Sequence, residues 1–279
     1  MPVAFLRPLS VCALALLSMF ANEGNPVHAG AADTPSVFLE DLTWTELSAR
    51  IAAGATTVLV PIGGTEQNGP HMVLGKHNVR VRAVAGQIAH ALGHTMVAPV
   101  LAYVPEGSVS PPTAHMRFTG TISIPDAAFE SVLEGAARSF RQHGFRDVVF
   151  LGDHGGYQKN EVRVATKLNR EWSSDRATRV HALAQYYQVT QTEFVHALKG
   201  RGYSSAEIGT HAGLADTSLA MAVNPALVRS DVLAPGKRLG AAEGVYGDPR
   251  RSNAEAGRVG LQQIIDASVL AIRAAIQSH

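Results

Sequence analysis

Short apolar runs alternate along this chain with longer stretches in which apolar residues recur at helical spacing. The apolar runs predict buried strands at residues 57–62, 95–103, 147–151 and 179–187. The helical spacing predicts helices at residues 78–92, 127–143, 160–173, 214–223 and 257–276. Strands that alternate with helices predict an α/β fold, in which a mostly parallel sheet carries helices on both faces. After a polar linker at residues 30–36 we see no internal repeat and no further linker that would divide the chain, and we therefore expect a single domain within residues 30–279.

The first 29 residues have a different pattern. Arg7 precedes an apolar run from Leu9 to Phe20, which is too short to span a bilayer comfortably. Val27-His28-Ala29 then places small residues where signal peptidase cleaves. We interpret residues 1–29 as a secretory signal peptide and expect a periplasmic or secreted protein with no membrane segment after processing. The alternative is a buried N-terminal helix.

The amino-acid composition limits the kinds of partner and metal site that the chain can have. The chain has 279 residues, of which 46% are hydrophobic and 17% charged, and its formal net charge is +1. This charge provides no basic field for a phosphate backbone, so we expect no nucleic-acid partner. Cys12 is the only cysteine and lies in the predicted signal peptide. The mature chain would therefore have no disulfide, cysteine nucleophile or thiolate zinc site, and a metal would need His, Asp or Glu ligands.

A cluster of polar side chains follows the first predicted strand. Glu66, Asn68, His71 and His77 lie on a loop rich in glycine and proline. Glycine lets the backbone turn sharply and proline holds it in place, so such a loop can present metal ligands rigidly. The alternative is an ordinary surface turn.

Two further clusters occupy comparable places. Asp153 and His154 follow the strand at 147–151 and are flanked by glycines, and His211 and Asp216 open the helix at 214–223. Because the carboxyl ends of parallel strands meet at one edge of a sheet, we expect the first two clusters to lie together. His154 could instead cap the next helix, and Asp216 could simply complement a helix dipole.

These motifs, taken in order, resemble those of the creatininase family. The pattern Pro-x-Gly-x-x-Glu-Gln-x-Gly-Pro-His occurs at residues 61–71, and His-x-x-Phe-x-Gly-Thr at 115–121. His-Gly-Gly follows at 154–156, and His-Ala-Gly-x-x-acid-Thr-Ser at 211–218. The resemblance runs from Val58 to about Val228. It implies an α/β metal-dependent amidohydrolase that acts on a small molecule and forms a homo-oligomer, often a hexamer.

The chain also departs from the family pattern at the metal ligands. Asn68 stands where the family usually has a histidine, His77 stands at the position of its bridging aspartate, and Gly156 replaces a glutamate. An imidazole does not readily bridge two ions, because its two nitrogens point apart. We therefore predict one divalent metal held by Glu66, His77 and His154. Zinc is the first choice, and iron(II) or manganese would also suit these ligands.

The resemblance suggests roles for the remaining residues. His211 matches the catalytic histidine of the family and is predicted to be the general acid, while Asp216 would orient it or act as a base. We expect Asn68, His71, His115 and Asp153 to support the ligands or contact substrate. Glu106 could contact a polar substrate group or could be an exposed loop residue.

The predicted function is hydrolysis of a non-peptide C–N bond, such as that of a cyclic amide, by a metal-activated water. One alternative is a periplasmic hydrolase of a lactone or carbohydrate derivative. Another is a small-molecule binding protein that descends from the family and has lost catalysis.

Overall fold

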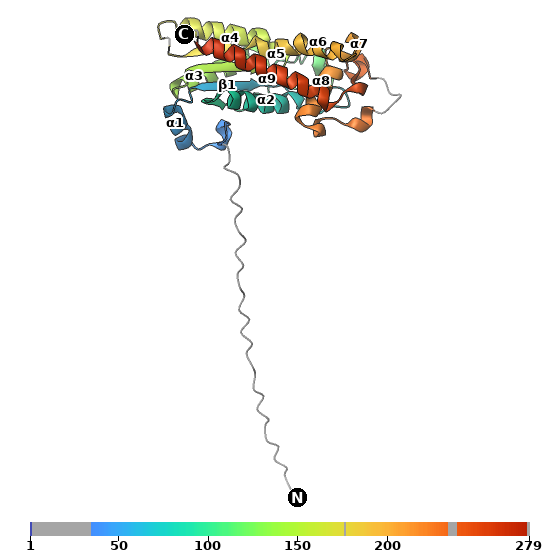
Figure 1. The fold of residues 1–279 in the computed structure, drawn as a ribbon, viewed down its shortest axis with the longest axis horizontal. Coiled ribbons are helices and arrows are strands. Elements are labelled where there is room, and N and C mark those ends of the chain that lie inside the picture. Colours follow the sequence, from blue (N-terminus) through green and yellow to red (C-terminus); the bar gives the residue numbers. More distant parts are fainter. Residues whose placement is uncertain (2–34, 176, 234–238, 278–279) are drawn as a thin grey trace. The chain divides into compact units, whose positions relative to one another are not determined.

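A parallel sheet forms the centre of the computed structural model (Figure 1). Its strands follow the order β2-β1-β3-β4. They are β1 (Thr57–Ile62), β2 (Thr95–Val97), β3 (Asp147–Gly152) and β4 (Arg179–Ala182). Thr57 is opposite both Thr95 and Asp147, and Asp147 is opposite Arg179, so the strands start in register. This arrangement confirms the predicted α/β fold with a parallel sheet.

The structure describes Met1 and residues 35–175, 177–233 and 239–277. The predicted signal peptide, apart from Met1, therefore lies outside the described residues. Residues 36–279 form one compact unit. The predicted boundary at residue 30 stays a prediction.

Helices cover both faces of the sheet. One face carries α1 (Trp44–Ala52), α3 (Asp126–Gln142) and α4 (Gln158–Glu171). The other face carries α2 (Lys76–Leu92), α5 (Ala184–Gln191), α6 (Glu193–Gly200), α7 (Ser205–Ile208), α8 (Leu214–Val223) and α9 (Ala254–Gln277). Short 3-10 turns span Leu39–Asp41, Ala114–Arg117, Gly155–Tyr157, Pro225–Leu227, Ser230–Leu233, Ala241–Glu243 and Pro249–Arg251.

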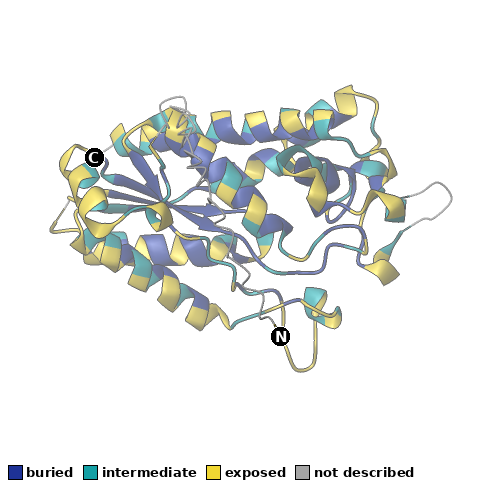
Figure 2. Cartoon of the chain, turned by 90° about the horizontal axis from the view of Figure 1, so that it is seen from below, coloured by how far each residue is buried: buried dark blue, intermediate teal, exposed yellow. Residues whose placement is uncertain are grey.

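Each face of the sheet has its own apolar core, because side chains alternate along a strand. Val58 and Val60 pack with α3 and α4, whereas Leu59 between them packs with α2 and α9. Every residue of β1 and β3 is buried, and Figure 2 shows the sheet enclosed by helices whose outer sides are exposed. The continuous apolar runs of the sequence reflect this burial on two faces.

The prediction of a strand at residues 179–187 was wrong over its second half. β4 ends at Ala182, and residues 184–187 begin α5. Ala182 is the last residue of β4 that pairs with β3, and β3 itself ends two residues beyond their pairing, at Gly152, so residues 185–187 have no strand to pair with. The helices α1, α5, α6 and α7 were not predicted. The strand predicted at 95–103 is also shorter, since regular pairing ends at Val97.

Helix α9 is long and apolar enough to cross a membrane by length and composition alone. Its inner side, which includes Leu261, Ile264 and Ile272, is buried in the core beside α2, α5 and α8. Arg258, Asp266 and other polar residues lie on its exposed side. This distribution is typical of a core helix rather than of a membrane span.

The side chain of Tyr157 ties the end of β1 to the end of β3. Its buried hydroxyl oxygen accepts hydrogen bonds from the backbone N–H groups of Asp153 and His154, each at 3.1 Å. The same oxygen lies 2.8 Å from the carbonyl oxygen of Ile62 and 2.6 Å from that of Gly63, and its single proton can be donated to one of them. One tyrosine therefore sets the distance between the loops that follow the two central strands.

We expect Tyr157→Phe to lower the free energy of unfolding by about 1–3 kcal/mol, because buried backbone groups would lose a hydrogen-bond partner. Urea unfolding of the two proteins measures this difference. Tyr103→Phe is the matched control, since the side chain of Tyr103 is exposed. An equal effect of the two substitutions would contradict the role assigned to the Tyr157 hydroxyl.

Candidate functional site

Glu66 lies at the centre of the loops that follow β1 and β3. Its side chain has no solvent exposure. On one side, Oε1 lies 2.8 Å from Nε2 of His77 and 3.7 Å from Nδ1 of His211. On the other side, Oε2 lies 3.2 Å from Nε2 of His115 and 3.8 Å from Nε2 of His154. Four imidazoles that are far apart in the sequence thus surround one carboxylate.

A second carboxylate, that of Glu106, is buried next to this group. Only 3% of the residue is exposed, so of the two alternatives left open by the sequence, that of an exposed loop residue is wrong. Glu106 Oε2 lies 3.7 Å from Nδ1 of His154. Gly64 makes room for the side chain, because a Cβ on this residue would lie 2.7 Å from Glu106 Oε1.

Four of these residues could hold a metal ion: Glu66, Glu106, His115 and His154 each offer one ligand atom, and these atoms lie within 4.8 Å of one another. Neither oxygen of Glu106 has a hydrogen-bond partner among the described residues, and Glu66 Oε2 also lacks one, since His115 is close but poorly aligned. Buried carboxylate oxygens without partners are costly. A divalent cation would remove this cost, so the residues fit such an ion.

The electrostatics of the two carboxylates differ. Burial and the neighbouring Glu66 raise the pKa of Glu106 to about 9. Burial also disfavours the charged form of Glu66, but the hydrogen bond from His77 and the charges of nearby cationic groups outweigh it and hold its pKa below the usual range. Burial lowers the pKa of His154 to about 4, which leaves its imidazole neutral and able to bind a metal at neutral pH.

The two predicted histidine ligands, His77 and His154, lie near opposite carboxylate oxygens of Glu66. Glu66 and His154 belong to the four-residue cluster, whereas His77 contacts the opposite oxygen of Glu66. Asp153 fixes the His77 ring, with Oδ2 at 2.5 Å from Nδ1. Asp153 in turn accepts hydrogen bonds from Arg80 and from the hydroxyl of Tyr186. The side chain of Asp153 therefore positions His77, as a carboxylate behind a metal-binding histidine commonly does.

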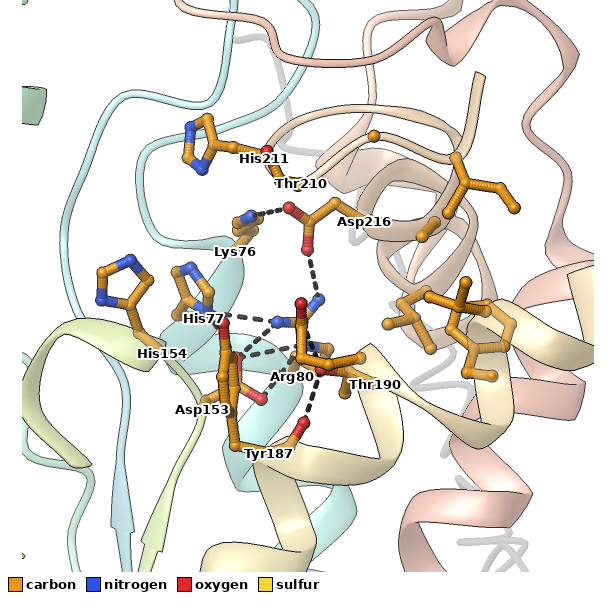
Figure 3. Close-up of a pocket in the computed structure, with 17 residues that line it drawn as sticks. Lys76, His77, Arg80, Asp153, His154, Tyr187, Thr190, Thr210, His211 and Asp216 are labelled. Atoms are coloured by element: carbon orange, nitrogen blue, oxygen red, sulfur yellow. Dashed lines mark hydrogen bonds and ion pairs between the residues drawn. The ribbon is translucent and has the colours of Figure 1, made fainter. Parts of the chain in front are cut away.

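A cavity of about 70 Å³ lies beside the cluster (Figure 3). Lys76, Arg80, Asp216 and His211 are among its lining residues, together with His154. The carboxylate of Asp216 forms ion pairs with Lys76 at 2.9 Å and with Arg80 at 3.2 Å. This volume would admit a small polar group or several water molecules.

The loop before α8 points His211 toward the cavity. Ala212 has a φ of 53°, a left-handed conformation that is unfavourable for a residue with a Cβ. The Nε2 atom of His211 lies 3.0 Å from the carbonyl oxygen of Gln67. Burial, followed by the charge of Lys76, lowers the pKa of His211 to about 4. The same Nε2 lies 3.1 Å from the side-chain amide nitrogen of Gln67. In the tautomer that donates its Nε2 proton to the backbone carbonyl of Gln67, the lone pair of His211 is on Nδ1.

The segment at residues 244–251 contacts the same loop. Tyr246 exchanges backbone hydrogen bonds with His211 and Thr210, and the carbonyl of Gly244 accepts a bond from the side chain of Gln67. The same Gln67 amide lies 3.0 Å from Nδ1 of His115. This segment therefore helps to hold two histidines of the site in position.

Asn68 and His71 are buried but are not among the residues that line the cavity. The amide nitrogen of Asn68 donates to the backbone carbonyls of Glu66 and Val73, which shapes the loop. The Nε2 atom of His71 lies 3.0 Å from the hydroxyl of Thr217. Their roles stay predictions, and these contacts favour support of the loop over contact with substrate.

The sequence interpretation assigned no role to Lys76 or Arg80, although both are buried at the site. A signal was present, since Lys76, His77 and Arg80 fall in the first turns of α2. Cationic side chains there oppose the helix dipole, and a local conflict of this kind often marks a functional site.

Known proteins resemble this chain over most of its length. The family model for creatininase, described as creatinine amidohydrolase, matches residues 40–272. A creatinine amidohydrolase from Pseudomonas putida is 28% identical over 201 residues, which cover 70% of this chain and 75% of the relative. A mycofactocin precursor peptide peptidase from Mycolicibacterium smegmatis is 29% identical over 234 residues, which cover 76% of this chain and 83% of the relative.

Solved structures of creatininase share the fold. One is described as "Creatininase Mn" and is 26% identical, with a TM-score of 0.71. A mutant creatininase described as "Zn-Zn type" is also 26% identical, with a TM-score of 0.70. Each alignment covers 86% of this chain and 98% of the solved chain.

The raised pKa of Glu106 predicts a pH dependence of the metal-free protein. The group contributes fully to stability below its ordinary pKa of 4.5, and this contribution is lost as the pH rises through about 9. The slope is at most about 1.4 kcal/mol per pH unit, because one proton is involved. We expect Glu106→Gln to remove this slope, since glutamine does not ionise.

Urea unfolding between pH 5 and 9 in the presence of a chelator measures the effect. Glu40→Gln is the surface control, since Glu40 is exposed. If the stability of the wild-type protein and that of Glu106→Gln changed in parallel with pH, Glu106 would not be the group responsible.

Proposed function

The chain belongs to the creatininase family, and we propose that it is a metal-dependent amidohydrolase that cleaves a non-peptide C–N bond, such as that of a cyclic amide. The main support is that two buried carboxylates converge on two imidazoles, and that three of the carboxylate oxygens have no hydrogen-bond partner within the described part of the chain. The small polar cavity beside them supports a small-molecule substrate. From the sequence we also propose an exported protein that forms a homo-oligomer.

We propose a single zinc ion, bound by Glu66 and His154 with Glu106 and His115 completing the cluster. Manganese or iron(II) would suit the same mixture of carboxylates and imidazoles. We propose one ion because the amide nitrogen of Asn68 already donates to backbone carbonyls and Gly156 has no side chain to offer a ligand. When bound, such an ion polarises a carbonyl and makes a water more acidic.

His211 is proposed to transfer a proton from the attacking water to the leaving nitrogen. Its Nδ1 takes a proton from the attacking water as the oxygen of that water bonds to the amide carbon. The same proton then passes to the nitrogen as the C–N bond breaks, which yields a carboxylic acid and an amine. His211 therefore acts first as a general base, because its lowered pKa leaves it neutral at the start of the reaction. It then acts as the predicted general acid.

Asp216 is proposed to orient His211 rather than to exchange protons. Its Oδ2 accepts a hydrogen bond of 3.0 Å from the backbone N–H of Ala212, the residue that follows His211. Its other contacts are with Lys76 and Arg80, whose positive charges favour the ionised carboxylate. Burial opposes ionisation, but these charges outweigh it and hold the pKa of Asp216 well below the usual range.

Substitution of the metal ligands tests the site. We expect Glu66→Ala and His154→Ala to weaken zinc binding by at least about 100-fold, since each removes a direct ligand. Competition with a chromophoric chelator measures the affinity, and circular dichroism checks the fold. His196→Ala is the control, because His196 is exposed on α6.

The same assay separates the two ligand sets. We expect Glu106→Gln to weaken binding more than His77→Ala does, because Glu106 belongs to the cluster. The reverse order would place the ion on the set predicted from the sequence, namely Glu66, His77 and His154. Tight binding retained by both Glu66→Ala and His154→Ala would contradict a metal site at this position.

Activity is tested on the zinc-loaded mature protein with cyclic and linear amides, lactams and lactones, with products followed by mass. We expect amine or ammonia release, and we expect His211→Asn to lower kcat by about 100-fold to 10,000-fold with unchanged zinc content. His90→Asn, at an exposed position of α2, is the control. Turnover of lactones alone would contradict the amidohydrolase, and full activity of His211→Asn would contradict its role.

A further inference from the structure

We propose that the ammonium group of Lys76 binds an oxygen anion in the cavity beside the metal cluster: the oxygen of the carbonyl under attack, and then the carboxylate of the product. This inference rests on the proposed function, because it names the group that receives the substrate oxygen in that reaction. It is carried by the burial of Lys76, by the contacts of its Nζ and by its place in the cavity wall.

Lys76 is buried, and its ammonium group has N–H donors without an acceptor among the described residues. Only 1% of the residue is exposed. Its Nζ lies 2.9 Å from Oδ2 of Asp216, and it lies 4.0 Å from Oε1 of Glu66, too far for a hydrogen bond. The contact with Asp216 is an ion pair by distance, yet its angles do not make a hydrogen bond, and the described residues offer Nζ no other acceptor. An ammonium group carries three N–H donors, so donors remain for a ligand.

The carboxylate of Asp216, next to Lys76, also has other partners. Asp216 also pairs with Arg80 at 3.2 Å and accepts the backbone N–H of Ala212 at 3.0 Å. Arg80, by contrast, has a close second partner in Asp153, at 2.8 Å. Both cations line the cavity (Figure 3). Arg80 is in close contact with the carboxylates of Asp153 and Asp216, whereas Lys76 is in close contact only with Asp216, which it shares with Arg80. This asymmetry leaves Lys76 as the cation that can accept another anion.

The position of Lys76 suits an anion that also contacts the metal centre. Glu66 turns Oε1 toward Lys76 and Oε2 toward the cluster, so the ammonium and the cluster flank one carboxylate. A product carboxylate has the same spacing between its oxygens as Glu66. Lys76 is also the first residue of α2, where the positive end of the helix dipole adds to the attraction for an anion.

The test compares two small probes of the zinc-loaded protein by calorimetry. Acetate stands for the product carboxylate and would contact both Lys76 and the ion. Acetohydroxamate chelates the ion through two oxygens and depends mainly on the metal. We expect Lys76→Met to bind acetate at least about 10-fold more weakly, which is the effect of losing one hydrogen bond from a charged group, with acetohydroxamate affinity little changed.

Two further variants separate binding from a structural role. Asp216→Asn should bind acetate more tightly than the wild-type protein, because Lys76 would lose a competing anion, whereas loss of a structural ion pair would weaken binding in both variants. Lys167→Met is the control, since the Nζ of Lys167 pairs with Glu134 at 2.6 Å on the surface. Zinc content and circular dichroism are measured for every variant.

Unchanged acetate affinity in Lys76→Met would overturn the proposal, and so would equal weakening of both probes. If acetohydroxamate failed to bind even the wild-type protein, the metal-dependent function would fail instead. The Lys76 proposal would then be judged by acetate alone, and it would fall if wild-type and Lys76→Met proteins bound acetate equally.

Discussion

The buried carboxylate of Glu66 is the constraint around which the site is arranged. A charge with no solvent exposure must be compensated by its surroundings, and four imidazoles and the ammonium of Lys76 lie near it. These groups come from the start of α2, the 3-10 turn Ala114–Arg117, the loop after β3 and the turn before α8. The fold is needed to bring them together, and the charge of Glu66 explains why cationic and neutral nitrogen groups surround it.

Behind this inner group lies a network that sets its geometry. Asp153 and Asp216 are both linked to Arg80, and Asp153 fixes the ring of His77. Tyr157 connects the two strand ends from which Glu66 and His154 follow. Because these polar groups are paired, and Arg80, Asp153 and Tyr157 are also buried, displacement of one would leave its partners without compensation, so the network favours a single arrangement.

The departures from the family pattern all concern the metal ligands. Asn68, His77 and Gly156 replace residues that the resemblance assigns to a second metal. In the same region, Lys76 and Arg80 provide permanent positive charge at the start of α2. A protein that exchanged a second ion for a fixed ammonium would keep a cation near the substrate oxygen with less dependence on metal supply. The proposed single-metal site and the proposed role of Lys76 are therefore compatible with each other.

The amino-acid sequence by itself determined the class of fold and the family. The continuous apolar runs at residues 57–62 and 147–151 indicate strands that are buried on both faces, and Glu66 and His154 lie in the glycine-containing loops that follow these strands. Tertiary structure decided the rest. Glu106 and His115 join the cluster from the segments that follow β2, whose sequences carry no periodic signal, and Lys76 and Arg80 line the cavity from the first turns of α2. Residues 184–187 form a helix where β3 comes to an end. Burial and pairing between segments that are distant in the sequence create these features, and local patterns do not determine them.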